Sequence, residues 1–258
     1  MIKIVINEAI GEVEQFTFPG GEVQIRIPEE PTYSEDLDSG VIVHADIKNS
    51  DDVIALLLSM SVLRETLPNT YYALFLRYFP YARQDRACQP REAFSLKVFA
   101  DLINSLEFSY VAVWDFHNED LLHLIDNVIH TSQEILVEDL ATNYKTLVSP
   151  DKGASKKIKV FEKSHNIIVG EKIRDVATGE ILKTEVHYKD CDKSEPILII
   201  DDICDGGRTF IELAKVLKSE GFTTIDLYVT HGIFSKGREV FDGLIRDVYT
   251  ANNFNKVV

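Results

Sequence analysis

Two adjacent carboxylates and a pair of glycines lie close together near the C-terminal end of the sequence. Asp201 and Asp202 follow a short aliphatic run, and Gly206 and Gly207 precede a predicted helix at 209–219. Paired carboxylates can accept hydrogen bonds from neighbouring hydroxyls, whereas free N–H groups at the positive end of a helix dipole favour a phosphate. The segment therefore predicts a sugar-phosphate site.

Taken alone, this segment could also be an ordinary loop with an acidic helix cap. A further predicted strand at 224–230 completes a βαβ unit. The loop then lies at the carboxyl end of a strand, where open sheets bind ligands. This context favours the ligand site over the plain loop.

Two polar segments in the first half could bind a nucleotide. Residues 78–86 read YFPYARQDR, and the planar fork of arginine suits phosphate. Residues 114–120 read WDFHNED, with His117 placed after a predicted strand where it could coordinate a metal. The competing interpretations are a solvated loop and a structural histidine.

Two polar segments in the second half could also bind a phosphate-containing substrate or its metal. Residues 149–157 read SPDKGASKK, in which Asp151 could hold Mg²⁺ or a sugar hydroxyl; the competing interpretation is a charged interdomain turn. Lys172 and Arg174 lie in a polar stretch at 170–180 that is long enough for a mobile hairpin. Cations on a closing loop would stabilise charge on a transferring phosphate.

Strand-like and helix-like segments alternate along the whole chain, which indicates an α/β fold. Ser149 and Pro150 interrupt the pattern, so we predict two domains, 1–147 and 148–258. The strands are expected near 2–6, 41–45, 70–76, 109–114, 158–161, 166–169, 181–187, 197–201 and 224–230, and the helices near 51–65, 94–106, 134–147 and 209–219.

The composition excludes several classes of protein. The net charge of −15 argues against a nucleic-acid surface. Residues 77–97 and 150–174 nevertheless carry +7 together, which leaves −22 elsewhere and suggests sites for a small polyanion. The longest apolar run, 53–63, is too short for a bilayer and no signal peptide is evident, so we expect a cytoplasmic protein that binds no membrane. The three scattered cysteines are expected to be free thiols.

In this order, the segments resemble those of the ribose-phosphate pyrophosphokinase family, over nearly the whole chain. YFPYARQDR resembles the family's ATP-binding segment, WDFH its metal- and ATP-contacting segment, and SPDKGASKK its Ser-Pro-Asp-Ala-Gly-Gly segment. Lys172 and Arg174 fall where the family has a Lys-Arg-Arg catalytic loop, and Asp201 to Thr209 resembles its ribose-5-phosphate loop.

The resemblance implies two similar phosphoribosyltransferase-like domains, each a mostly parallel sheet flanked by helices, in a homodimer or higher homo-oligomer. It implies transfer of the diphosphoryl group of Mg-ATP to the anomeric hydroxyl of ribose 5-phosphate, with Mg²⁺ as cofactor. The implied catalytic residues are Lys172 and Arg174, and His117 and Asp151 are the implied metal ligands. The implied ATP-binding residues are Phe18, Glu22, Arg83, Gln84, Asp85, Arg86 and His117. The implied ribose-phosphate residues are Asp151, Asp201, Asp202, Asp205, Gly206, Gly207, Arg208 and Thr209.

Three departures from the family pattern bear on function. The family's Phe-x-Asp-Gly-Glu segment appears as Phe18 to Glu22 without its central acid, and Ile173 replaces the middle basic residue of the catalytic loop. Arg208 stands where the family has glycine, which would suit an acceptor with a second phosphate such as ADP-ribose.

Two further functions compete with this one. A plain phosphoribosyltransferase would explain the segment from Asp201 to Thr209, but it would not need YFPYARQDR or the first α/β half. A non-catalytic regulatory relative should have lost Asp151 or the cations Lys172 and Arg174, and all three residues are present. Both functions are therefore less favoured than diphosphoryl transfer.

Overall fold

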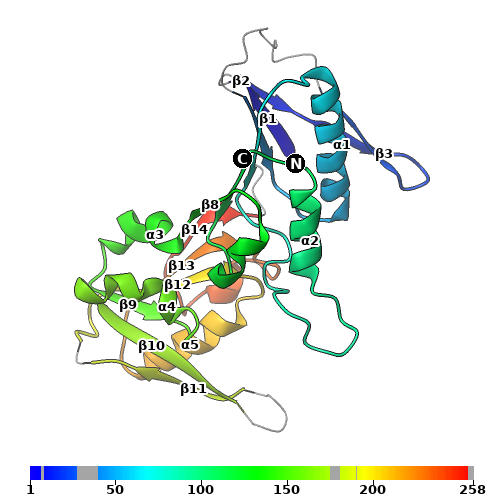
Figure 1. Cartoon of the computed structure of the whole chain (residues 1–258). Helices are drawn as coiled ribbons and strands as arrows, with labels where there is room; N and C mark the ends of the chain where they lie inside the picture. Colours follow the sequence, from blue (N-terminus) through cyan, green and yellow to red (C-terminus); the bar gives the residue numbers. More distant parts are fainter. Residues whose placement is uncertain (7–8, 28–39, 175–180, 190, 255–258) are drawn as a thin grey trace. The chain divides into compact units, whose positions relative to one another are not determined.

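The computed structural model describes residues 1–6, 9–27, 40–174, 181–189 and 191–254 (Figure 1). The chain divides into two compact units, Met1–Thr131 (unit 1) and Ser132–Val258 (unit 2). The predicted boundary at 147 differs from this division, because helix α3 (Gln133–Ala141) and strand β9 (Thr146–Ser149) pack within unit 2.

Unit 1 is built on a six-stranded sheet whose order is β2-β1-β5-β6-β7-β8. Strand β1 is antiparallel to both of its neighbours, and the strands from β5 to β8 are parallel to one another. The strands of this sheet are β1 (Ile2–Ile6), β2 (Ala9–Glu12), β5 (Val41–Ala45), β6 (Tyr72–Leu76), β7 (Tyr110–Trp114) and β8 (Val128–Thr131).

Two helices and a hairpin complete unit 1. Helix α1 (Ser50–Thr66) begins at a capping box, in which the side chain of Asn49 accepts the Asp52 N–H while Asp52 accepts the Asn49 N–H. Helix α2 (Ser95–Asn104) precedes β7, and a 3₁₀ turn, η1 (Glu119–Leu124), precedes β8. The antiparallel hairpin of β3 (Glu14–Thr17) and β4 (Val23–Arg26) extends away from the sheet (Figure 1).

Unit 2 has a second six-stranded sheet, of order β11-β10-β9-β12-β13-β14. All neighbouring strands are parallel except β10 and β11, which form an antiparallel hairpin. Besides β9, the strands are β10 (Asn166–Arg174), β11 (Ile181–His187), β12 (Ile197–Cys204), β13 (Ile225–Gly232) and β14 (Val248–Asn253).

The central strand β12 is buried on both faces, as its aliphatic run predicts. Ile197 and Ile199 pack in one cluster with residues of helix α5 (Arg208–Ser219). Leu198 and Ile200 pack in another cluster, with residues of α3 and the short helix α4 (Ser155–Ile158). Since successive side chains of a strand point to opposite faces, helices therefore cover both faces of this sheet.

Two predicted elements are wrong in detail. Residues 158–161 do not form a strand, because they lie at the end of α4 and in a 3₁₀ turn, η2 (Lys159–Lys163). The helix predicted over 134–147 ends at Ala141. The last two residues of the predicted range, 146 and 147, belong instead to β9, which pairs with β10 and β12 in the middle of the sheet. The fold class itself is confirmed: two α/β units, each with a mostly parallel sheet.

Candidate active site

The carboxylates of Asp201 and Asp202 lie in the last half of β12, which runs three residues further than predicted, to Cys204. Asp202 is buried, and its N–H donates to Asp201 Oδ1 at 3.0 Å. The parallel neighbour β13 ends at Gly232, beside Cys204. Both carboxylates therefore lie near the carboxyl edge of the sheet, where open α/β sheets bind ligands.

These carboxylates belong to a cluster of acidic side chains. Burial raises the pKa of Asp201 well above its usual range, and the negative charges of Asp202 and Asp151 raise it further. Lys157, from α4, lies 3.7 Å from Asp202 Oδ2, and both side chains are mostly buried. Lys157 belongs to the predicted SPDKGASKK segment, but its partner is far away in sequence and could not be predicted. The excess of negative charge would favour a bound cation.

The loop after β12 leads directly into helix α5. Gly207 is the residue before the helix and has a φ of 75°, in the left-handed region that favours glycine. A Cβ on Gly207 would lie only 2.8 Å from Phe241 Cζ, whereas one on Gly206 would meet nothing closer than 3.6 Å. The two glycines thus leave the backbone next to the helix N-terminus without side chains, which suits a phosphate site. We call residues 205–209, which include the first two residues of α5, the acceptor loop, after the role that the family resemblance implies for them.

The remaining residues of the acceptor loop differ in burial. The side chains of Asp205 and Arg208 are exposed, and that of Thr209 is half-buried. Within the described part of the chain, Arg208 forms no ion pair. Cys204, just before the loop, is fully buried, and burial raises the pKa of its thiol to about 12. This cysteine is therefore a packing residue rather than a nucleophile.

Asp151 follows β9 at the same edge of the sheet. Its Oδ1 accepts the N–H groups of Gly153 and Ala154, both at 3.0 Å, which holds the turn before α4. Strand β10 passes close to this turn: a Cβ on Gly170 would lie 2.6 Å from the carbonyl oxygen of Pro150. Only glycine at position 170 lets the two backbones approach in this way.

The predicted catalytic residues Lys172 and Arg174 lie near the end of β10, two and four residues beyond Gly170. Their backbones pair with β11 at Thr184 and Ile181, with a bulge between Ile173 and Arg174. The predicted loop therefore begins as a strand, and its residues 175–180 lie outside the described part of the chain. Glu171, between Gly170 and Lys172, forms an ion pair with Lys152 of the Asp151 turn and a hydrogen bond with Nε2 of His187 of β11 at 2.9 Å.

In unit 1, the structure brings together the two predicted nucleotide-binding segments. Strands β6 and β7 are parallel neighbours, so the segments that follow them start from the same edge of the sheet. Asn118 Nδ2 donates to Asp85 Oδ2 at 2.9 Å, which joins them directly. The rings of Phe79 and Phe116, one from each segment, pack against each other with centroids 5.4 Å apart. Sequence reasoning missed Asn118, because its partner is non-local.

Around this junction, the side chains of Arg83, Gln84, Arg86 and His117 are exposed. Asp85 is half-buried, with Arg86 Nε 3.9 Å from its Oδ1. The backbone carbonyl of Gln84 accepts the N–H of Leu96, which ties the segment to α2. An exposed group of cations on a fixed backbone suits the phosphates of a nucleotide.

The predicted ATP-contacting residues Phe18 and Glu22 lie at the tip of the β3–β4 hairpin. Both side chains are exposed, and their backbones are linked by the Phe18 N–H donating to the carbonyl of Glu22 at 2.9 Å. The ring of Phe18 packs against that of Phe16 with centroids 5.5 Å apart. The hairpin thus offers an aromatic pair and an acid to solvent.

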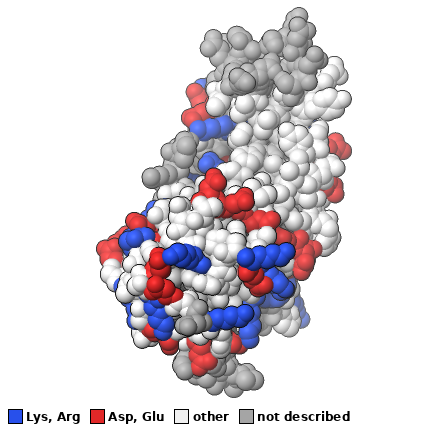
Figure 2. All heavy atoms as spheres, turned by 90° about the vertical axis from the view of Figure 1, so that its left-hand side faces the viewer, with Lys and Arg blue, Asp and Glu red and all other residues white. Residues whose placement is uncertain are grey.

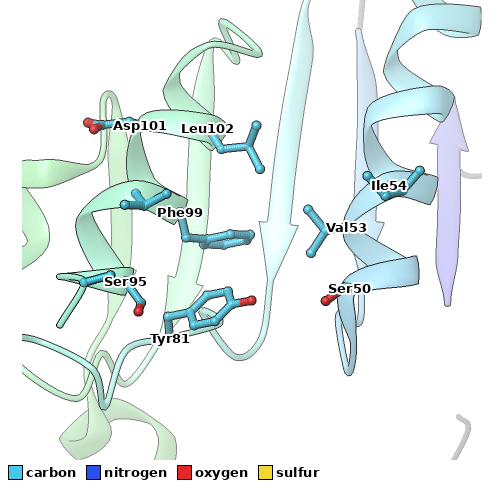
Figure 3. A pocket seen from close by; sticks show the side chains of 10 residues that line it. Ser50, Val53, Ile54, Tyr81, Ser95, Phe99, Asp101 and Leu102 are labelled. Atoms are coloured by element: carbon cyan, nitrogen blue, oxygen red, sulfur yellow. The ribbon is translucent and has the colours of Figure 1, made fainter. Parts of the chain in front are cut away.

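A groove of about 640 Å³ separates α1 from α2 in unit 1 (Figure 3). Its lining is mostly apolar: Val53 from α1 points toward Phe99 and Leu102 from α2, Ile54 also lines the groove, and Tyr81 lies at one end. Asp101 is its acidic residue, and no lysine or arginine is among the described residues that line it. A triphosphate would find no positive partner there, so the groove is a poor nucleotide site.

The two predicted metal ligands, His117 and Asp151, belong to different units. Within the described ranges, no three side chains of the His, Cys, Asp and Glu types are arranged to hold a metal ion. Carboxylate oxygens nevertheless suit Mg²⁺, which commonly takes one or two protein carboxylates and completes its shell with water and substrate phosphate. The acidic cluster around Asp201 fits such a cation by its donor type.

On the face shown in Figure 2, Lys and Arg side chains are interspersed with Asp and Glu side chains rather than gathered into a continuous basic field. This face therefore carries no basic stripe of the kind found on nucleic-acid-binding surfaces. Among the described helices, none has the length and apolar character needed to cross a bilayer.

Several known proteins are similar to this chain. Residues 1–106 match the N-terminal domain of ribose phosphate pyrophosphokinase. The chain is 30% identical to the ribose-phosphate pyrophosphokinase of Rhizobium meliloti over 245 residues, which cover 90% of this chain and 75% of the relative. It is 29% identical to that of Mycoplasmopsis pulmonis, covering 94% and 77%. The phosphoribosylpyrophosphate synthetase of Mycobacterium smegmatis has the same fold, with a TM-score of 0.72 at 20% identity over 93% of this chain and 80% of that one.

Proposed function

Because the chain belongs to the ribose-phosphate pyrophosphokinase family of transferases, we propose that it makes phosphoribosyl pyrophosphate and AMP from Mg-ATP and ribose 5-phosphate. The anomeric hydroxyl oxygen of the acceptor attacks the β-phosphorus of ATP. The bond between that phosphorus and the oxygen bridging to the α-phosphate breaks, AMP leaves, and the hydroxyl loses its proton. The reaction needs alignment and charge stabilisation rather than a protein nucleophile.

The observation that carries this proposal is the carboxyl edge of unit 2. There two carboxylates at the end of β12 adjoin a glycine loop in which Gly207 adopts a left-handed conformation before α5. Asp201 and Asp202 would bind the ribose hydroxyls, and the acceptor loop with Thr209 would bind the 5-phosphate. Asp151, whose turn lies at the same edge, would share the ribose and the metal.

The edge of unit 1 supports the nucleotide half of the proposal. Arg83, Gln84 and Arg86 would bind ATP beside His117, with Asp85 held in place by Asn118. Phe18 and Glu22 would contribute from the exposed hairpin, in this chain or in a second copy of it. Mg²⁺, when bound, would neutralise charge on the ATP phosphates.

The test is AMP release from Mg-ATP by the purified protein, with ribose 5-phosphate as acceptor and the products identified by mass. We expect the variant carrying both Lys172→Ala and Arg174→Ala to bind nucleotide normally and to turn over roughly 10³-fold more slowly. Unchanged turnover in this variant would remove both residues from the mechanism. No AMP from the wild-type protein with any acceptor would favour a non-catalytic, regulatory function.

One observation supports a second acceptor, ADP-ribose, for the same chemistry. Arg208 is exposed at the first residue of α5, immediately after Gly207, where it could bind a second phosphate. Offering ADP-ribose separately in the same assay tests this. If ADP-ribose is the preferred acceptor, Arg208→Gly should lower its kcat/KM about tenfold and change that of ribose 5-phosphate much less.

A further inference from the structure

The segment after β13, residues 233–238, is fixed against the end of β12. The N–H groups of Ile233 and Phe234 both donate to the carbonyl oxygen of Cys204, at 2.8 and 3.1 Å. The ring of Phe234 is buried, and a Cβ on Gly232 would lie only 2.0 Å from its Cε2. The start of this segment therefore cannot move away from the acceptor loop without breaking buried contacts.

The far end of the segment is held by the side chain of Arg238. The guanidinium of Arg238 stacks on the ring of Phe234, 4.5 Å from its centroid, and Nη1 donates to the carbonyl of Val248 at 3.2 Å. Just beyond lies Phe241, the residue whose ring approaches Gly207. The segment is thus anchored at both ends along one side of the acceptor loop, and we call it the brace.

This brace places Lys236 over the acceptor loop. The Cδ and Cε atoms of Lys236 lie 3.6 Å from the point where a Cβ of Gly206 would be. Its ammonium group, one bond beyond Cε, therefore lies beside the loop. The side chain is exposed, and Lys236 forms no ion pair with any residue that the structure describes. In a protein with a net charge of −15, such a cation is available to an anionic ligand.

We propose that Lys236 binds the phosphate on C5 of the acceptor ribose, and this inference rests on the proposed function. Its stem packs over Gly206 while its ammonium reaches the phosphate from the side opposite the loop backbone. The N–H groups at the start of α5 would bind the other phosphate oxygens. The ammonium is a compact point charge with three rotatable donors, so it would bind one phosphate or a diphosphate.

The absence of a side chain at position 206 is part of this arrangement. Gly206 does not need a left-handed conformation, since only Gly207 in this loop has a positive φ. A Cβ at 206 would be in ordinary contact with the lysine stem, at 3.6 Å. A larger side chain at this position would meet the stem and displace the ammonium.

The experiment measures binding of ribose 5-phosphate to the full chain by calorimetry, so that it does not depend on turnover. We expect Lys236→Ala to weaken this binding about tenfold, the usual loss for one charge-assisted hydrogen bond, and Lys236→Arg to recover most of it. A non-hydrolysable ATP analogue should bind to Lys236→Ala and the wild type equally well. The matched control is Lys218→Ala, an exposed lysine at the opposite end of α5, which should change neither affinity.

The outcomes separate this inference from the proposed function. Wild-type AMP release together with unchanged ribose 5-phosphate affinity in Lys236→Ala would overturn the role of Lys236 and leave the reaction standing. Equal weakening of ribose 5-phosphate and of the ATP analogue would also overturn it, because the lysine would then act on the whole structure. If the wild type binds no ribose 5-phosphate and releases no AMP, both proposals fail together.

Discussion

At the scale of single residues, the buried carboxylate of Asp226 holds together three polar groups. It is fully buried at the start of β13, at the end opposite the acceptor loop. It accepts the hydroxyl of Tyr144 at 2.7 Å, Nε of Arg246 at 2.9 Å and the N–H of Asp247 at 3.1 Å. Burial, together with the hydrogen bond to Asp226, raises the pKa of the Tyr144 hydroxyl far above its usual range.

Replacing Asp226 should therefore destabilise the protein without affecting substrate binding. We expect Asp226→Asn to lower the free energy of unfolding by about 3 kcal/mol, because Arg246 and Tyr144 lose a buried charged partner. Asp247→Asn is the control: this exposed carboxylate lies 3.1 Å from the same arginine, and its loss should cost about 0.5 kcal/mol. Urea unfolding compares the two variants, and equal losses would contradict the role given to Asp226.

His44, in β5, should make unit 1 sensitive to acid. Its pKa is lowered by burial and by the nearby charge of Arg77, and its ring packs on Phe75 with centroids 4.9 Å apart. The folded state thus favours the neutral ring and binds fewer protons than the unfolded state, so stability falls as the pH drops through about 6.5. We expect His44→Phe to flatten the decline in Tm between pH 7 and pH 5. His123→Gln, a control at an exposed histidine, should leave the decline unchanged. Parallel curves of Tm against pH for the wild type and both variants would show that His44 does not cause the decline.

At the scale of elements, the junction of β12 and α5 depends on one glycine far more than on its neighbour. Gly207→Ala places a side chain at a φ of 75° and 2.8 Å from Phe241 Cζ, which should cost about 2–3 kcal/mol. Gly206→Ala meets nothing closer than 3.6 Å and should change stability by less than about 1 kcal/mol. Thermal unfolding of the two variants is a direct comparison, and similar losses would show that the left-handed turn does not fix this junction.

Local chemistry explains which elements the sequence could predict. The run Ile197–Ile200 could be read as a buried strand because every residue of it is apolar, and the structure confirms burial on both faces. Strand β9 was missed because four residues, Thr146–Ser149, directly follow a helical pattern and become a strand only by pairing with β10 and β12. Residues 158–161 have strand-like composition, but they continue the turn of α4.

The candidate site divides in the same way. Asp201, Asp202 and the glycines could be placed together because they are neighbours in sequence. The contacts Asp85 with Asn118 and Asp202 with Lys157 join segments 33 and 45 residues apart, so only the fold reveals them. Lys236 was missed for the same reason, since it reaches Gly206 from the next strand's loop.

At the scale of the whole molecule, each of the two units is proposed to bind one of the two substrates. Each has its own sheet and its own buried clusters, and each presents polar residues at the carboxyl edge of that sheet. The segments proposed for ATP all lie in unit 1, and those proposed for the acceptor all lie in unit 2. Binding of one substrate alone should therefore stabilise one unit locally.

Hydrogen–deuterium exchange of the full chain can test this division. Ribose 5-phosphate at 100 times its Kd stabilises the bound state by about 2.7 kcal/mol, so amides whose opening requires its release should exchange roughly 100-fold more slowly. We expect that protection in residues 201–209 and not in residues 78–86 or 114–120. A non-hydrolysable ATP analogue should protect the latter two segments first. The two units have separate cores, so stabilisation of unit 2 should not spread to unit 1. Protection of 78–86 by ribose 5-phosphate alone would therefore mean that unit 1 binds the acceptor.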